Sequence, residues 1–217
     1  MLPPIMQSPK VLLFDFDGTI ADTLTVSVGI FNAMSEEFSY RPIPEEEIPA
    51  ARKMGVREII ATYGISLLSV PKIAHRGLKL LHARMDDINP FVGIPEVLHQ
   101  LKARGYILGI LTSNSEENVS LFLRRHQLEI FDFISSSSRL LGKARVIRQI
   151  LKKNRWSKKE VIFLGDECRD IEAAHKTGIG MVAVPWGFNS RDALCAFHPE
   201  QIVETPAEIL HLFPPCH

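Results

Sequence analysis

Residues 11–19 decide the fold and read Val-Leu-Leu-Phe-Asp-Phe-Asp-Gly-Thr. The run is apolar at its start and ends in two carboxylates, a glycine and a threonine. A short apolar run of this kind predicts a buried strand. Carboxylates beside a hydrophobic core are costly unless a partner, most simply a bound cation, compensates them. The end of this strand is therefore the first candidate site.

Four later segments share the apolar, β-rich character of the first, at residues 106–112, 131–134, 161–164 and 180–184. Amphipathic helical patterns occupy residues 94–104 and 118–126 between them. Strands that alternate with amphipathic helices predict a parallel sheet covered on both faces. The expected fold class is therefore α/β, with a doubly wound parallel sheet.

Residues 22–89 interrupt this alternation because they contain helical patterns and turn clusters without a convincing core strand. Pro42 and Pro44 precede an acidic helix start, and Pro71 opens a long helical pattern that runs toward Asp87. We expect a helical insert at residues 22–89. The α/β core then consists of residues 1–21 together with residues 90–217.

Polar residues follow three of the predicted strands. In open parallel sheets, ligands bind beyond the carboxyl ends of the strands, so these residues are expected to meet at one edge. The set combines four carboxylates with hydroxyl and amide groups: Asp15, Asp17, Thr112, Ser113, Asn114, Asp166 and Asp170. The edge of the sheet is thus the predicted site.

Asp15 and Asp17 share one side of an extended segment because they are two residues apart. One acid can then attack a substrate while the other moves protons. An Asp-rich turn is the alternative interpretation. A calcium-binding EF-hand is excluded, because Thr19 and Ile20 stand where that loop needs an acid or amide and a glycine.

Asp166 and Asp170 are four residues apart at a helix start and would share one face of that helix. Helix capping explains the first acid but leaves the second without a role. Lys143 begins another helix, where the helix dipole disfavours a cation. An anionic substrate would supply a reason for it, although a lone lysine is most often a solvated surface charge.

Composition narrows the class of protein. Twenty-five basic and twenty-five acidic residues balance, so no global charge favours nucleic acid or an anionic membrane. Cys168, Cys195 and Cys216 lack the spacing of a disulfide framework or a zinc site and favour a reducing compartment. The proline-broken N-terminus lacks a signal peptide pattern, and no apolar run approaches the ~20 residues of a membrane span. We expect a cytoplasmic protein.

Taken together, these residues resemble the haloacid dehalogenase superfamily of phosphohydrolases, in particular the phosphoglycolate-phosphatase-like branch with a small helical C1-type cap. Residues 15–19 resemble the first family motif and residues 110–112 the second. Lys143 resembles the third motif, and Gly165-Asp166 with Asp170 the fourth. The resemblance implies a Rossmann-like core with the cap inserted after the first strand.

The resemblance also implies roles at the sheet edge. Asp15 would attack phosphorus to form an aspartyl-phosphate, and Asp17 would protonate the leaving group and later activate water. Mg²⁺ would be the cofactor, bound by Asp15, the backbone carbonyl of Asp17, Asp166, and Asp170 directly or through water. Thr112 and Lys143 would stabilise the phosphoryl group, and both would bind substrate together with Ser113, Asn114 and, from the cap, Arg52.

The expected activity is a magnesium-dependent phosphatase for a small phosphorylated metabolite, either phosphoglycolate-like or a sugar phosphate. Asp17 favours the phosphate branch over the dehalogenases. A phosphomutase of the β-phosphoglucomutase type and a catalytically idle interaction module stay open, as does the choice between monomer and homodimer. Lys53 and Arg57 are further cap cations, and Glu167 stands where many relatives carry a small hydroxyl residue.

Overall fold

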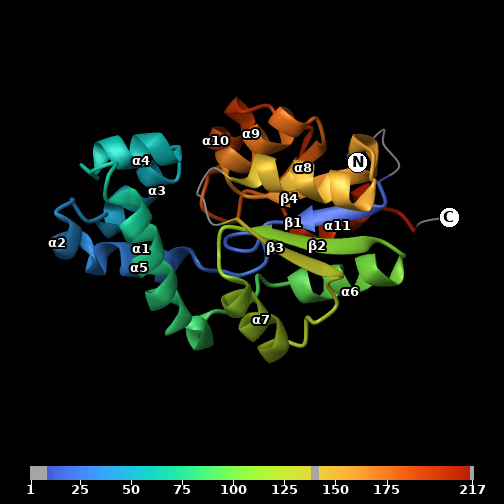
Figure 1. Cartoon of the computed structure of the whole chain (residues 1–217), viewed down its shortest axis with the longest axis horizontal. Coiled ribbons are helices and arrows are strands. Elements are labelled where there is room, and N and C mark those ends of the chain that lie inside the picture. The colour runs from blue at the N-terminus through green and yellow to red at the C-terminus, as the bar shows by residue number, and fades with distance from the viewer. Residues whose placement is uncertain (1–8, 138–141, 216–217) are drawn as a thin grey trace.

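The computed structural model describes residues 9–137 and 142–215, so residues 1–8 of the N-terminus and Cys216 lie outside it. Its sheet contains six parallel strands in the order β3-β2-β1-β4-β5-β6 (Figure 1). The strands are β1 (Val11–Phe14), β2 (Ile107–Thr112), β3 (Phe133–Ser136), β4 (Val161–Gly165), β5 (Gly180–Ala183) and β6 (Gln201–Ile202). This order is that of a doubly wound sheet, so the expected α/β class is confirmed.

The strands agree with the sequence patterns to within one residue at β2, β4 and β5 and differ more elsewhere, beginning with the first strand, whose pattern predicted residues 11–16. β1 ends at Phe14 because the chain turns after it, and the carbonyl of Phe16 accepts the N–H groups of Thr19, Ile20 and Ala21. β3 begins two residues later than the pattern predicted, at Phe133. β6 was not predicted, because two residues are too short to show an alternation.

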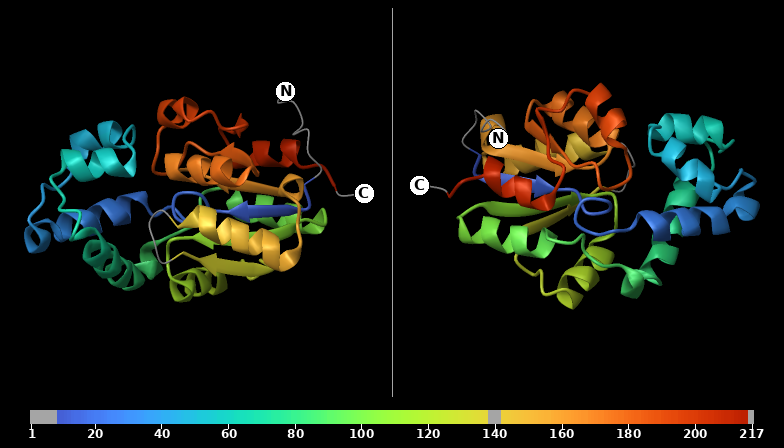
Figure 2. Two further views of the ribbon diagram at one scale, coloured as in Figure 1. Left: turned by 45° about the horizontal axis from the view of Figure 1, so that its top comes forward. Right: turned by 180° about the vertical axis from the view of Figure 1, so that it is seen from behind.

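Helices cover both faces of the sheet (Figure 2). Leu12 and Phe14 of β1 pack into one apolar cluster and Val11 and Leu13 into the other, as strand alternation requires. The first face carries α6 (Ile94–Ala103), α7 (Glu116–Arg125) and α11 (Pro206–Leu212). The second carries α8 (Lys143–Asn154), α9 (Cys168–Thr177) and α10 (Arg191–Ala196), and the short 3-10 helix η3 (Lys158–Glu160) precedes β4.

Residues 22–89 add helices but no strand of the sheet. In Figure 1 these helices lie beyond the carboxyl ends of the strands. They are α1 (Leu24–Ala33), α2 (Ser35–Phe38), η1 (Glu45–Glu47), α3 (Ile48–Ala51), α4 (Val56–Thr62), α5 (Val70–His82) and η2 (Met85–Asp87). We call residues 22–89 the insert and the remainder the core; this division stays a prediction.

The chain enters and leaves the insert at one place. Ala21 forms an antiparallel bridge with Pro90, and the N–H of Asp22 donates to the carbonyl of Asn89 at 2.9 Å. The two linkers therefore lie side by side next to the end of β1. Across residues 9–137 and 142–215, no helix combines the length and the apolar character that crossing a bilayer requires.

Candidate active site

Asp15 lies at the centre of the carboxyl edge of the sheet. Its N–H donates to the carbonyl of Leu164 at 2.8 Å, and its Oδ1 accepts the N–H of Phe16 at 2.7 Å. The side chain is buried, and removal from water raises its pKa, which Lys143 partly offsets. The backbone of β1 thus fixes one carboxylate between the ends of β2 and β4.

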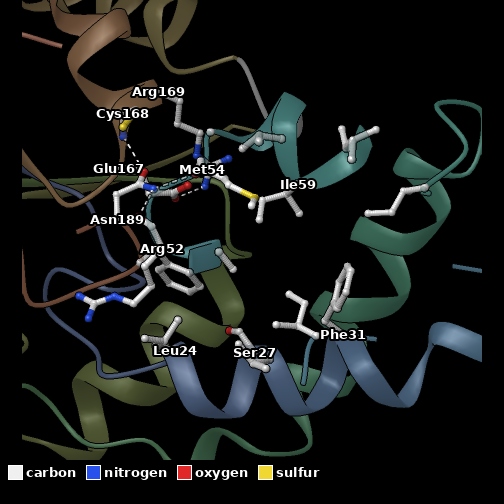
Figure 3. A pocket seen from close by; sticks show the side chains of 18 of the residues that line it. Leu24, Ser27, Phe31, Arg52, Met54, Ile59, Glu167, Cys168, Arg169 and Asn189 are labelled. Carbon is white, nitrogen blue, oxygen red and sulfur yellow. Dashed lines mark hydrogen bonds and ion pairs between the residues drawn. The ribbon is translucent and has the colours of Figure 1, made fainter. Parts of the chain in front are cut away.

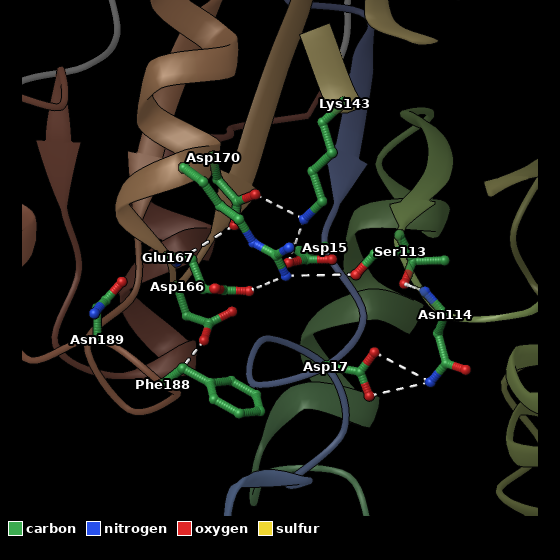
Figure 4. A network of polar contacts seen from close by, with 12 residues as sticks. Asp15, Asp17, Ser113, Asn114, Lys143, Asp166, Glu167, Asp170, Phe188 and Asn189 are labelled. Atoms are coloured by element: carbon green, nitrogen blue, oxygen red, sulfur yellow. Dashed lines mark hydrogen bonds and ion pairs between the residues drawn. The ribbon is translucent and has the colours of Figure 1, made fainter. Parts of the chain in front are cut away.

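Lys143 is the first residue of α8 and is buried against two carboxylates. Its Nζ lies 2.5 Å from Oδ2 of Asp15 and 2.6 Å from Oδ1 of Asp170 (Figure 4). Burial works to lower the pKa of this ammonium, but the two acids outweigh it and raise the pKa. The lysine is therefore a fixed positive charge, and these carboxylates compensate its unfavourable place at a helix start.

Three carboxylates form a group suited to a divalent cation. Oxygens of Asp15, Asp166 and Asp170 lie within 4.8 Å of one another, and all three side chains are buried. Burial and mutual repulsion raise the pKa of Asp166 well above its usual value, and burial raises that of Asp170 to about 6. Clustered hard oxygen donors of this kind fit Mg²⁺.

Asp17 occupies a different environment from the acidic group. Both of its carboxylate oxygens accept from Nδ2 of Asn114, at 3.1 and 3.2 Å. Removal from water raises the pKa of Asp17 to about 6, although the bonds from Asn114 oppose the shift. A carboxyl group with this pKa exchanges its proton close to neutral pH, which suits a general acid and base.

The residues after β2 face the same edge. Thr112 is buried, and its Oγ1 accepts the N–H of Asn114 at 2.9 Å, so its hydroxyl proton can point toward a ligand. Ser113 lines the cleft described below. The structure therefore brings Thr112, Ser113 and Asn114 to the edge that also carries Asp15 and Asp17.

Gly18 allows the turn after β1 to pack closely against Asp166. Its φ is +78°, and a Cβ built on it would lie 2.1 Å from Oδ2 of Asp166. Both the left-handed backbone and the close approach require glycine. Oδ1 of the same Asp166 accepts from the hydroxyl of Thr19 at 2.7 Å, so the turn after β1 also orients the acid that follows β4.

Three site residues were not predicted as functional from the sequence. Arg169 forms an ion pair with Glu167, and its Nη2 lies 3.4 Å from Oγ of Ser113. Asn189 accepts the N–H of Cys168 at 2.9 Å. Glu167 was visible as a departure from the usual family pattern, whereas an arginine inside a helix and an asparagine in a loop carry no distinctive signal.

Among the described residues, no ion pair joins the predicted insert cations to the acidic group, although Arg52 lines the smaller of the two cavities described below. Nη2 of Arg52 donates to the carbonyl of Pro185 at 2.9 Å, and Asn189 donates to the carbonyls of Arg52 and Met54 at 3.1 and 3.0 Å. These contacts tie the loop after α3 to the core. They give Arg52 a part in joining the insert to the core, and its predicted role in substrate binding stays a prediction.

Two adjoining cavities separate the insert from the core. A cleft of about 900 Å³ reaches Asp17, Ser113 and Arg169 on its core side. A smaller cavity of about 320 Å³ extends from it between the insert helices (Figure 3). On the insert side the cleft wall is mainly apolar, with Ile30, Phe31, Met34, Val56, Val70, Ile73, Leu78 and Leu81. Neither cavity is lined by Lys53 or Arg57.

Comparison with known proteins shows the family to which the chain belongs. The family model for haloacid dehalogenase-like hydrolases matches residues 12–184. A phosphoglycolate phosphatase from Synechococcus elongatus is 36% identical over 202 residues, covering 93% of this chain and 95% of its own. An N-acetylmuramic acid 6-phosphate phosphatase from Pseudomonas aeruginosa is 26% identical and covers 93% of both chains.

Solved structures agree on the fold. A haloacid dehalogenase-like family hydrolase from Streptococcus pneumoniae superimposes with a TM-score of 0.79 at 24% identity, covering 95% of this chain and 99% of its own. The family match spans β1 to β5 and therefore includes the acidic edge and the insert. The chain belongs to the haloacid dehalogenase-like hydrolases, as a phosphatase of the phosphoglycolate-phosphatase-like branch.

Proposed function

We propose that the protein is a magnesium-dependent phosphatase that hydrolyses a small phosphorylated metabolite through an aspartyl-phosphate on Asp15. The observation that carries the proposal is the surroundings of Asp15. A buried lysine ammonium lies 2.5 Å from its Oδ2, two more carboxylates lie beside it, and Asp17 follows two residues later. This arrangement supports Asp15 as the nucleophile, Lys143 as a fixed cation and Asp17 as the proton carrier.

In the first half-reaction, a carboxylate oxygen of Asp15 attacks phosphorus, and the bond from phosphorus to the leaving oxygen breaks. Asp17 donates its proton to that oxygen, for which its pKa of about 6 suits it. Asn114, which holds both oxygens of Asp17, orients the acid. The products of this step are the free alcohol and phosphorylated Asp15.

In the second half-reaction, ionised Asp17 takes a proton from water as the water oxygen attacks the same phosphorus. The bond from phosphorus to the Asp15 oxygen breaks, and inorganic phosphate is released. Asp15 returns as a carboxylate, and Asp17 is again protonated for the next cycle. One strand end therefore serves both steps.

The charge on the phosphoryl group requires compensation in both steps. Lys143 supplies it beside Asp15, while Thr112, Ser113 and Asn114 offer hydrogen-bond donors at the end of β2. Asp15, Asp166, Asp170 and the backbone carbonyl of Asp17 would hold Mg²⁺, which supplies further positive charge when bound. The first three residues present the hard oxygen donors that this ion prefers.

We propose that the insert acts as a cap over the cleft, where it keeps bulk water out and selects the leaving group. The names of the relatives support a small phosphorylated metabolite, with phosphoglycolate the first compound to test and sugar phosphates next. The balanced charge and the cysteine pattern support a cytoplasmic protein without a nucleic-acid or membrane partner, and we propose that it is a monomer or a homodimer.

The test is turnover of p-nitrophenyl phosphate with Mg²⁺ by the wild type, Asp15→Asn and Asp22→Asn. Asp22 is an exposed acid in the same segment and serves as the matched control. We expect loss of activity in Asp15→Asn alone. Equal rates for Asp15→Asn and the wild type would reject the proposal.

A panel of phosphorylated metabolites then identifies the substrate and the reaction type. The readouts are released phosphate and the identity of the organic product. Release of one phosphate for each substrate consumed supports hydrolysis. Conversion to a phosphorylated isomer with little free phosphate would instead show a phosphomutase.

A further inference from the structure

We infer that Arg169 is a second phosphoryl-binding cation, and that Glu167 is the residue that positions it. The inference rests on the proposed function, because it adds a binding group to the same phosphoryl site. It also gives a role to Glu167, the residue that departs from the usual pattern of the fourth motif. Neither residue belongs to the set that the sequence predicted.

The side chain of Arg169 crosses the edge of the sheet. It starts from the second residue of α9, after β4, and its Nη2 reaches to 3.4 Å from Oγ of Ser113, which follows β2. β1 lies between these two strands, and Asp15, which follows β1, is among the carboxylates whose charge acts on the guanidinium. Lys143 contacts Asp15 from α8, and the two cations therefore come from different elements.

Glu167 holds the guanidinium in this place. The ion pair between Glu167 and Arg169 is largely buried, with 13% and 15% of the two side chains exposed. Burial works to lower the pKa of the guanidinium, but Glu167 and the neighbouring aspartates outweigh it and raise the pKa. A guanidinium has five N–H donors arranged as a fork, so it can serve a carboxylate and a phosphoryl group together.

The charge balance at the edge requires a cation of this kind. Five carboxylates gather here against the two cations Lys143 and Arg169: Asp15, Asp17, Asp166, Glu167 and Asp170. With Asp17 protonated for the first step, four carboxylates oppose these two cations, so a divalent ion brings the sum only to zero and leaves the charge of a phosphate dianion uncompensated. Within the cleft, the insert contributes mainly apolar side chains with Ser27 and His75. Arg52 lines the adjoining cavity, where its Nη2 donates to the carbonyl of Pro185, so the cations paired with the acids of the edge come from the core.

Binding of inorganic phosphate, measured by calorimetry with and without Mg²⁺, tests the inference without depending on turnover. In Arg169→Gln we expect phosphate to bind about 10- to 100-fold more weakly, the range for losing one charge-assisted contact. Arg169→Lys should fall between this variant and the wild type, because it keeps the charge but loses the fork. In Glu167→Gln the arginine stays but is less well held, and we expect about a 3- to 10-fold loss.

Arg191→Gln is the matched control, since Arg191 forms an exposed ion pair with Glu204 away from the edge. Its phosphate affinity should stay within about 2-fold of the wild type. Thermal melting checks that each variant is folded. If Arg169→Gln does not fold, the phosphate affinities of the two single variants Arg169→Lys and Glu167→Gln test the inference instead. In turnover, KM and the inhibition constant of phosphate should both rise in parallel with the calorimetric loss of affinity.

A folded Arg169→Gln that binds phosphate as tightly as the wild type would overturn the inference. So would a rise in KM restricted to carboxylated esters with unchanged phosphate binding, because that pattern assigns Arg169 to the leaving group. Failure of the proposed function is distinguishable. In that case the wild type hydrolyses no phosphate ester, yet its phosphate binding still depends on Arg169.

Discussion

The edge of the core and the facing wall of the insert differ in the polarity of their side chains. The edge gathers ionisable groups that are buried and paired, with Lys143 held between Asp15 and Asp170. The wall across the cleft is mainly apolar, and Lys53 and Arg57 do not line it. The edge therefore has the groups for phosphoryl chemistry. We therefore propose that the insert discriminates substrates chiefly by shape and apolar contact.

Among the variants considered, Lys143→Met is expected to have the largest effect on activity and stability. Removing a preorganised cation should lower turnover of p-nitrophenyl phosphate about 10²- to 10³-fold. Without Mg²⁺ it should also destabilise the fold by about 3–5 kcal/mol, because two buried carboxylates lose their partner. Steady-state kinetics and urea unfolding measure the two effects. Lys152→Met, on the exposed side of the same helix, is the control and should change neither.

Dependence of stability on Mg²⁺ and pH tests the acidic group of the edge. Burial raises the pKa of Asp166, Asp170 and Asp17, so the folded state binds protons more tightly than the unfolded state. Without metal, the contribution of these three acids to stability should therefore be greatest below about pH 4 and decline as pH rises through about 6.

Because Mg²⁺ competes with these protons, it should raise Tm by about 3–8 °C at pH 7.5 and by less at pH 5.5. Differential scanning fluorimetry measures both shifts. Asp166→Asn should abolish most of the increase. An equal increase at the two pH values would show that Mg²⁺ acts elsewhere.

Asn189→Ala should loosen the connection between the two regions. Its side chain bonds the N–H of Cys168 in the core and the carbonyls of Arg52 and Met54 in the insert. We expect a loss of about 1–3 kcal/mol in unfolding free energy and a several-fold rise in KM, because closure over the substrate weakens. Asn154→Ala, at the end of α8, serves as the control. An unchanged KM would show that Asn189 does not contribute to closure of the insert over the substrate.

The smallest effect is expected from the insert cations. Lys53→Ala and Arg57→Ala should each leave kcat/KM within about 2-fold of the wild type, as is usual for exposed charges away from a site. The measurement is the same kinetic assay on the best substrate of the panel. A loss above tenfold would mean that the insert closes further in the substrate complex and brings these cations to the substrate.

The sequence reveals the edge better than the insert for a physical reason. Asp15, Lys143 and Asp166 each follow an apolar strand or begin a helix, so local pattern and topology together place them at one edge. Arg169 and Asn189 take their roles from contacts distant in sequence, such as the one between Arg169 and Ser113, and no local pattern encodes these. β6 was missed because two residues show no periodicity.

The central claim is that Asp15 carries the phosphoryl group between the two half-reactions. In Asp17→Asn the base for the second step is lost, whereas p-nitrophenolate leaves without needing a proton in the first. After rapid acid quench of this variant with p-nitrophenyl phosphate and Mg²⁺, peptide mass spectrometry should find one phosphoryl group on Asp15. Release of p-nitrophenol with Asp15 unmodified, or a phosphoryl group on another residue, would contradict the account.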